Sequence, residues 1–226
     1  MIIELGEPIV ARGGEANLSQ DGSMLVWNKP VGVPVYGGSE NKQPIGAREY
    51  ISARYNDDWE PVNLIDRWAS GALLFAKEQG LLTALTTQLY DQGVVRVYRA
   101  LVVGQVDNVC GVIGQMGYCP IEKRAKLQQF PDATFTRSKI LPLEYRSGPT
   151  RDTITLVEIE TRPDLIGQVR LHLAHIGHPV CGSEGDPHRA EYERLMAHLY
   201  GFDIKHPGTG KVRYIRAPYP REFTLQ

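Results

Sequence analysis

Short β-rich segments and short helical segments follow one another along this chain of 226 residues without regular alternation. A repeating strand–helix–strand order would predict a parallel sheet, whereas this mixed order favours an α+β fold. We expect a mixed, mostly antiparallel sheet with flanking helices. The segments with a strand pattern are 24–30, 71–77, 94–104, 133–146, 152–161 and 212–218, and those with a helical pattern are 44–55, 78–93, 167–177 and 191–201.

Two further features of the pattern concern its continuity. The alternation of apolar residues in 152–161 breaks partway, which predicts a half-buried strand with a break in register. Neither a repeat nor a convincing linker divides the chain. We therefore expect a single domain over residues 1–226.

Composition excludes several classes of protein. Hydrophobic residues make up 42% of the chain and charged residues 23%, which is typical of an ordinary globular protein. No apolar stretch approaches the ~20 residues that span a bilayer, and the first ten residues lack the pattern of a signal peptide. The three cysteines form no C-x-x-C pair, which argues against a disulfide framework and a four-cysteine zinc site. We expect a cytoplasmic protein that acts away from membranes, as a monomer.

The charge is unevenly distributed although the formal net charge is only −1. Residues 1–60 carry nine acids and five bases, while the remainder carries 17 acids and 20 bases. Two stretches, 121–139 and 204–221, are richer still in Lys and Arg. Local basic surface can bind phosphates in a chain that is neutral overall, although either stretch alone is equally typical of solvated surface.

A lone carboxylate, Asp66, lies in the segment NLIDRWASGALLFAK, residues 63–77, directly before an apolar run. A turn or a helix N-cap would account for an aspartate at this place. A reactive group held beside a rigid strand would account for it equally well.

Two other clusters of chemical side chains have simpler explanations. His172, His175 and His178 are spaced by three, but Gly177 and Pro179 flank the last of them, so packing or RNA contact is favoured over a metal site. The carboxylates of DDWE, 57–60, suggest glycoside chemistry together with Asp66, but a solvated turn explains them better.

Four segments in order resemble the RluA-type pseudouridine synthase family. NLIDRWASGALLFAK is similar to the family pattern H-R-L-D-R-x-T-S-G-x-x-x-x-A-K, and RVYRALVVG, 96–104, to K-x-Y-x-A-x-V-x-G. GQVRLHLAHIGHPVCG, 167–182, is similar to H-Q-I-R-x-H-L-A-x-I-G-H-P-x-x-G, and LVWNKPVGVPV, 25–35, is close to N-K-P-x-G-x-x-V. The resemblance covers roughly residues 25–186. Each motif alone is weak, but four in family order are a strong signal.

The resemblance implies isomerisation of uridine to pseudouridine in tRNA or rRNA, in a central active-site cleft, with neither cofactor nor metal. By comparison with the family, we expect residues 1–226 to be the catalytic domain, with no separate N-terminal RNA-binding module. It implies that Asp66 is the catalytic aspartate, that Tyr98 contacts the target base and that Arg170 is the basic partner of the carboxylate. Substrate-binding residues expected around them are Asn63, Leu64, Arg67, Trp68 and Gln168.

The residue types suit that chemistry. A carboxylate can act as nucleophile or electrostatic partner at the anomeric carbon of the sugar, provided that it is ionised in its pocket. Burial opposes ionisation and a nearby guanidinium favours it. A tyrosine offers a flat face for stacking and a phenol for proton transfer. Taken singly, Tyr98 also fits a core position and Arg170 a solvated helix face.

The chain departs from the family pattern at the motif edges. Leu64 stands where the family has Arg, Asn63 where it has His, and TRPDLIG, 161–167, replaces T-G-R-T-H. An apolar side chain can hold an unstacked base step open. Leu64 or Trp68 is therefore a candidate to do this in place of the family's Arg.

These departures motivate an alternative function, a non-catalytic RNA-binding protein or RNA-folding helper on the same fold. A further alternative is a hydrolase that uses Asp66 with Asp57 or Asp58, and it has little support in the sequence.

Overall fold

The structure of the chain is a computed structural model that describes residues 9–10, 16–18, 22–37, 45–90, 93–119, 124–128 and 132–225. The chain divides into two compact units, Met1–Val94 with Leu199–Tyr219 and Val95–His198 with Pro220–Gln226. The expectation of one domain over residues 1–226 stays a prediction.

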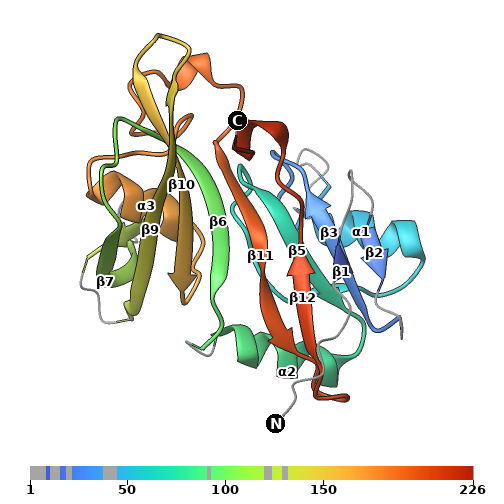
Figure 1. The fold of residues 1–226 in the computed structure, drawn as a ribbon. Coiled ribbons are helices and arrows are strands. Elements are labelled where there is room, and N and C mark those ends of the chain that lie inside the picture. The colour runs from blue at the N-terminus through green and yellow to red at the C-terminus, as the bar shows by residue number, and fades with distance from the viewer. Residues whose placement is uncertain are drawn as a thin grey trace. The chain divides into compact units, whose positions relative to one another are not determined.

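The first unit is built around strand β5 (Figure 1). Its strands run in the order β2-β3-β5-β11; β4 also pairs with β5, and β12 joins β11 to β1. The elements are β1 Ile9–Val10, β2 Ala16–Leu18, β3 Met24–Lys29, α1 Ala47–Tyr55, β4 Glu60–Pro61, β5 Ser70–Ala76, α2 Gln79–Tyr90, β11 Ala197–Lys205 and β12 Val212–Arg216.

Strand β5 is buried along its whole length, as its continuous apolar run predicts. At Gly71 the backbone adopts φ +129°, and a β-carbon there would lie 2.2 Å from the carbonyl oxygen of Leu199. Only glycine allows these two strands to approach so closely. Helix α2 packs against β5 and buries Leu85 and Leu89, in agreement with the helical pattern of 78–93.

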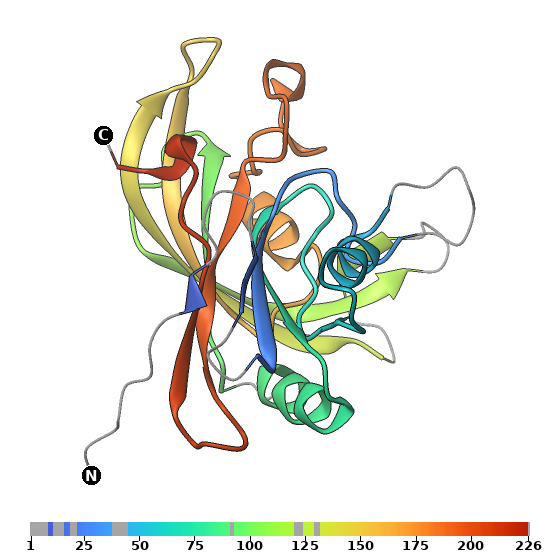
Figure 2. The ribbon, with the colours of Figure 1, turned by 90° about the vertical axis from the view of Figure 1, so that its right-hand side faces the viewer.

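The second unit is an antiparallel sheet in the order β6-β10-β9-β7-β8. Figure 2 shows its long β9–β10 hairpin in yellow. The predicted break in register is confirmed, between Leu156 and Val157. The elements are β6 Arg96–Val103, β7 Cys110–Cys119, β8 Arg124–Leu127, β9 Thr134–Ser147, β10 Thr153–Arg162, α3 Gln168–His175 and the short 3₁₀ turns Arg189–Glu191 and Arg221–Phe223.

Helix α3 is attached to β9 by buried polar side chains. Gln168 Nε2 donates to the carbonyl oxygen of Arg137 at 3.1 Å and to Ser138 Oγ at 3.3 Å. His172 lies one turn further on, with Nδ1 2.8 Å from Ser138 Oγ and Nε2 3.1 Å from Thr136 Oγ1. Burial lowers the pKa of His172 to about 4, so this imidazole is neutral at pH 7 and serves packing, as expected.

One predicted helix is wrong. Residues 191–201 have strong helix formers, but from Ala197 onward they form strand β11, and a 3₁₀ turn precedes it. The alternation of buried and exposed residues toward Lys205 is typical of a strand, and pairing with β12 overrides the local helix preference. The helix predicted over 44–55 begins at Ala47, and Pro44 lies outside the described residues.

The predicted α+β class is confirmed. Of the nine strand pairs whose register the structure describes, β1–β12 is parallel and the others are antiparallel, so the sheet is mixed, as expected. The expected central cleft stays a prediction. In the described ranges, no helix combines the length and the apolar character needed to cross a membrane.

Candidate functional site

The turn at Asp66 directly precedes strand β5. Asp66 is half-buried, and its Oδ1 accepts the backbone N–H of Trp68 at 3.0 Å, while its carbonyl accepts that of Ala69 at 3.1 Å. The aspartate thus forms an Asx turn and does not cap a helix. A side chain fixed by its own backbone beside a buried strand is a rigid support for chemistry.

A fully buried lysine ties this turn to the loop after β3. Lys29 Nζ donates to the carbonyl oxygens of Pro30 at 2.9 Å, Val33 at 2.8 Å and Arg67 at 3.1 Å. The same Arg67 carbonyl accepts the N–H of Gly32 at 2.9 Å, and Arg67 Nε donates back to the Gly32 carbonyl at 2.9 Å. Three charge-assisted hydrogen bonds compensate the burial of the ammonium group, and they fix the residue that follows Asp66.

Arg67 and Trp68 form an exposed pair on this turn. The guanidinium of Arg67 lies 4.8 Å from the centre of the Trp68 ring, and Trp68 is 53% exposed. A cation over an indole face is a favourable contact, and it presents a flat apolar surface next to Asp66.

Asn63 has a different environment from that of its neighbours. Its side chain is buried, with Nδ2 donating to the carbonyl of Ala72 at 3.1 Å and Oδ1 accepting the N–H of Leu74 at 2.8 Å. The side-chain amide therefore bonds to the backbone of β5 as a neighbouring strand would. This supports a positioning role for Asn63 more than contact with substrate. Leu64 next to it is half-buried.

Tyr98 lies on β6 in the second unit and is bonded to a carboxylate that sequence reasoning missed. Its phenol donates to Asp164 Oδ2 at 2.6 Å, and the tyrosine is 5% exposed. Burial of the carboxyl raises the pKa of Asp164 to about 6, although the positive charge of Arg96 and the hydrogen bond from Tyr98 both lower it. A lone aspartate between Pro163 and Leu165 was the available signal, of the same kind that marked Asp66.

The loop after Asp164 leads directly into α3. Leu165 and Gln168 exchange two hydrogen bonds, from the Leu165 N–H to Gln168 Oε1 at 3.1 Å and from the Gln168 N–H to the Leu165 carbonyl at 2.9 Å. Gln168 is fully buried, so its contacts support a positioning role. Arg170 is half-buried and reaches back toward the start of α3, where a β-carbon on Gly167 would lie 3.4 Å from its Nη2.

The predicted site residues therefore form two groups. Asn63, Leu64, Asp66, Arg67 and Trp68 lie together in the first unit. Tyr98, Gln168 and Arg170 lie in the second unit, connected through the Asp164 loop. Convergence of the two groups on one cleft stays a prediction.

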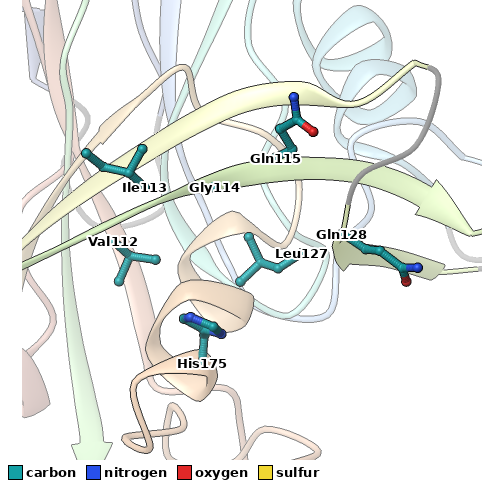
Figure 3. Close-up of a pocket in the computed structure, with 7 residues that line it drawn as sticks. All are labelled: Val112, Ile113, Gly114, Gln115, Leu127, Gln128 and His175. Carbon is teal, nitrogen blue, oxygen red and sulfur yellow. The ribbon is translucent and has the colours of Figure 1, made fainter.

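Two pockets among the described residues of the second unit lie beside β7, and neither is lined by these groups. One has a volume of about 200 Å³ between β7, β8 and the end of α3. Figure 3 shows Val112, Leu127 and His175 on the helix side of β7, whereas Ile113 points away from it. Within the part of the chain that the structure describes, no group of three or more His, Cys, Asp or Glu side chains is arranged to hold a metal ion.

The two basic stretches differ in their placement. In 204–221, Arg213 is buried, and Arg216 bonds Asp203 at 2.6 Å and stacks on Tyr200 and Tyr214, so these arginines serve internal contacts. In 121–139, Arg137 and Lys139 are exposed on β9. Lys123 and the side chain of Arg124 lie outside the described residues.

Residues 23–175 match the family model described as RNA pseudouridylate synthase. The chain belongs to the RNA pseudouridylate synthase family. The resemblance in its motifs is thereby confirmed, and the matched range includes Asp66, Tyr98 and Arg170.

Among RNA pseudouridylate synthases, this chain is similar to the ribosomal large subunit pseudouridine synthases C of Pasteurella multocida and Escherichia coli. It is 31% identical to the first over 223 residues, with 91% of this chain and 65% of that protein covered. It is 32% identical to the second over 225 residues, with coverages of 92% and 68%. The chain thus spans just under two thirds of the length of the Pasteurella relative.

Solved structures support the fold. The chain is similar to human RNA pseudouridylate synthase domain containing 1, with a TM-score of 0.71 and 19% identity over 92% of this chain and 84% of that one. For human RNA pseudouridylate synthase domain containing 4 the TM-score is 0.66 and the identity 17%, over 91% and 89%.

Proposed function

We propose that this chain isomerises uridine to pseudouridine in RNA, with Asp66 as the catalytic carboxylate. The observation that carries the proposal is the family match over residues 23–175, a range that includes Asp66. The resemblance of residues 63–77 to the family motif supports Asp66 as its aspartate. The relatives are named for the ribosomal large subunit, which supports rRNA, a cytoplasmic molecule, as the substrate class over the tRNA that the motifs also allowed.

The reaction is balanced within the substrate. The bond from the sugar C1′ to uracil N1 breaks, the ring turns over, and a bond from C1′ to C5 forms, while C5 loses a proton and N1 gains one. No oxidant, reductant or energy source is required, so the chemistry needs no cofactor. The target nucleotide must first leave its stack, because both bonds are hidden in a folded RNA.

Asp66 can act in this reaction as a nucleophile or as an electrostatic partner at C1′. Its Asx turn fixes the carboxylate through the Trp68 N–H, and the Lys29 contacts fix the turn itself. The exposed ring of Trp68, with Arg67 stacked on it, is suited to contact a base or the step from which the base has left.

Tyr98 and Arg170 are the proposed partners from the second unit. The hydrogen bond to Asp164 orients the Tyr98 phenol, whose face we propose stacks on the target base. The Arg170 guanidinium would favour the ionised form of the catalytic carboxylate. Asn63 and Gln168 act as positioning residues, because Asn63 is bonded to β5 and Gln168 holds the start of α3 against β9.

The test is a direct assay of product. Purified protein is incubated with rRNA and tRNA transcripts, and pseudouridine is measured by nucleoside mass spectrometry. We expect the wild type to convert at least one uridine, and Asp66→Asn to convert none. Asp58→Asn is the matched control, because Asp58 is an exposed carboxylate of the same unit, and it should match the wild type.

The other outcomes identify the alternatives. RNA binding by the wild type without any pseudouridine would favour the non-catalytic RNA-binding protein. Release of free uracil, lost in Asp58→Asn as well as Asp66→Asn, would favour the hydrolase.

A further inference from the structure

The sheet of the second unit has a second face, which the proposed reaction does not use. Thr136 and Ser138 on β9 point to α3, so the alternate residues Arg137 and Lys139 point to the opposite side. We call this side the outer face. Tyr98 is paired with the buried Ile159 and lies on the α3 side, away from the outer face.

The outer face contains a hollow of about 300 Å³. Two cross-strand rows surround it, and they run from β7 through β9 to β10. The first row is Gly111, Lys139 and Glu160, and the second is Ile113, Arg137 and Arg162. Gly111 has no side chain, and so it leaves space at one end of the first row.

The charges in the two rows differ. Lys139 stands opposite Glu160, which is a favourable cross-strand pair. Arg137 stands directly opposite Arg162, and like charges at opposed positions destabilise a sheet. Within the described ranges, the side chains of Arg137, Lys139 and Arg162 make no hydrogen bond or ion pair. An anion in the hollow would relieve this repulsion.

We propose that the hollow on the outer face binds a backbone phosphate of the RNA, with Arg137 and Arg162 as its ligands. The inference rests on the proposed function, which supplies RNA as the partner. Guanidinium groups match the geometry of phosphate, and two of them side by side bind it more tightly than one.

The neighbouring row indicates that this RNA segment is single-stranded. Phe135 is paired with Gln115, one row beyond Arg137, and it is 52% exposed. Ile113 is 68% exposed beside the hollow. An exposed aromatic ring next to a phosphate site is suited to stack on an unpaired base, as in other proteins that bind single strands. A region of the RNA beside the target uridine would thus be held on the outer face.

The experiment compares two double variants of equal charge. Arg137→Gln with Arg162→Gln removes the proposed ligands. Arg151→Gln with Arg189→Gln removes two exposed arginines of the same unit, one in the β9–β10 turn and one in the 3₁₀ turn that begins at residue 189. Binding of a fluorescein-labelled oligouridylate of about 12 nucleotides is measured by anisotropy over a series of salt concentrations.

We expect the first double variant to bind about tenfold more weakly at ~0.1 M salt, with a slope of log affinity against log salt that is smaller by about 0.7, because the contact with one phosphate is lost. The control should keep the wild-type slope. The melting temperature of the first variant should equal or exceed that of the wild type, because the opposed arginines repel each other in the free protein.

Three results would overturn the inference. These are an unchanged slope in the first variant, an equal loss of affinity in both double variants, and a fall in melting temperature that accompanies the loss of binding. If the first double variant does not fold, Arg162→Gln alone is compared with Arg189→Gln, and its slope should be smaller than that of this control by up to about 0.7. An unchanged slope with intact uridine conversion by the wild type would end this inference alone, whereas absent conversion would end the proposed function.

Discussion

The Asp66 turn of the first unit and the Tyr98 cluster of the second hold a reactive side chain in two different ways. Asp66 is fixed by the backbone N–H of Trp68, in a turn whose Arg67 carbonyl accepts a hydrogen bond from Lys29. Tyr98 is fixed by a side chain, the carboxyl of Asp164, whose pKa is raised by burial to about 6. The first arrangement depends on a backbone N–H and on the ammonium group of Lys29. The second depends on a carboxyl group that gains or loses a proton near pH 6.

This difference has a consequence for pH. Backbone amides do not titrate near neutrality, so the support of Asp66 stays constant between pH 5 and 8. The support of Tyr98 changes within that range, because Asp164 gains a proton below about pH 6. We therefore expect the two regions to respond differently to mutation and to acid.

The largest effect is expected from Lys29→Met, which breaks the support of the turn. Three carbonyl groups lose the ammonium group of Lys29 as a donor, and we expect the free energy of unfolding to fall by about 3 kcal/mol, as measured by urea denaturation. Conversion of uridine should fall as well, because the turn at Asp66 loosens. Lys77→Met is the control, since Lys77 makes an exposed ion pair with Asp57, and it should cost below about 1 kcal/mol. Equal losses in the two variants would contradict the role given to Lys29.

Tyr98→Phe tests the second region directly. The ring stays and the phenol is lost, so turnover at saturating RNA should fall about 100-fold. Tyr145→Phe, in which the lost hydrogen bond is to the carbonyl of Val106, should retain wild-type turnover. Full turnover by Tyr98→Phe would show that the phenol transfers no proton, and would leave stacking as the proposed role of the ring.

Asn63→Ala sharpens the view that this amide is part of the scaffold. Two buried hydrogen bonds to β5 are lost, and we expect the free energy of unfolding to fall by about 2 kcal/mol. The affinity for RNA should be unchanged when it is measured on folded protein. Asn108→Ala, at an exposed position, should leave stability unchanged. Weaker RNA binding by folded Asn63→Ala would instead support the substrate contact that the motif suggests.

Asp164→Asn has the smallest expected effect on turnover, about tenfold, because asparagine still accepts the Tyr98 hydrogen bond while the negative charge is lost. Wild-type turnover should decline as the pH falls through about 6, and this decline should be missing in the variant. A decline of the same size in both proteins would assign it to another group.

The same variant has a measurable effect on stability. Because the pKa of Asp164 is raised from 3.8 to about 6, the folded state binds more protons, and this group stabilises less as the pH rises through that range. His172, with its pKa lowered from 6.5 to about 4, acts in the opposite direction and favours the folded state as the pH rises. The two groups act against each other in the wild type, so Asp164→Asn should show a stability that rises more steeply between pH 4 and 6.

The sequence alone determined the α+β class, the buried strand β5, the helices α2 and α3, and the family. These follow from local periodicity and from motif order, both of which are written along the chain. The tertiary structure decided which way residues 191–201 fold, because β11 gains more from pairing with its neighbours than from its own helix preference.

The same division holds for the sites. Motif order marked Asp66, Tyr98 and Arg170, but only the structure revealed that Asp164 bonds Tyr98, that Lys29 holds the turn, and that Arg137 opposes Arg162. The residues in each of these contacts are far apart in the sequence. The smallest separation, between Arg137 and Arg162, is 25 positions. Strand pairing and burial bring such residues together, and neither leaves a signal in the spacing of the chain.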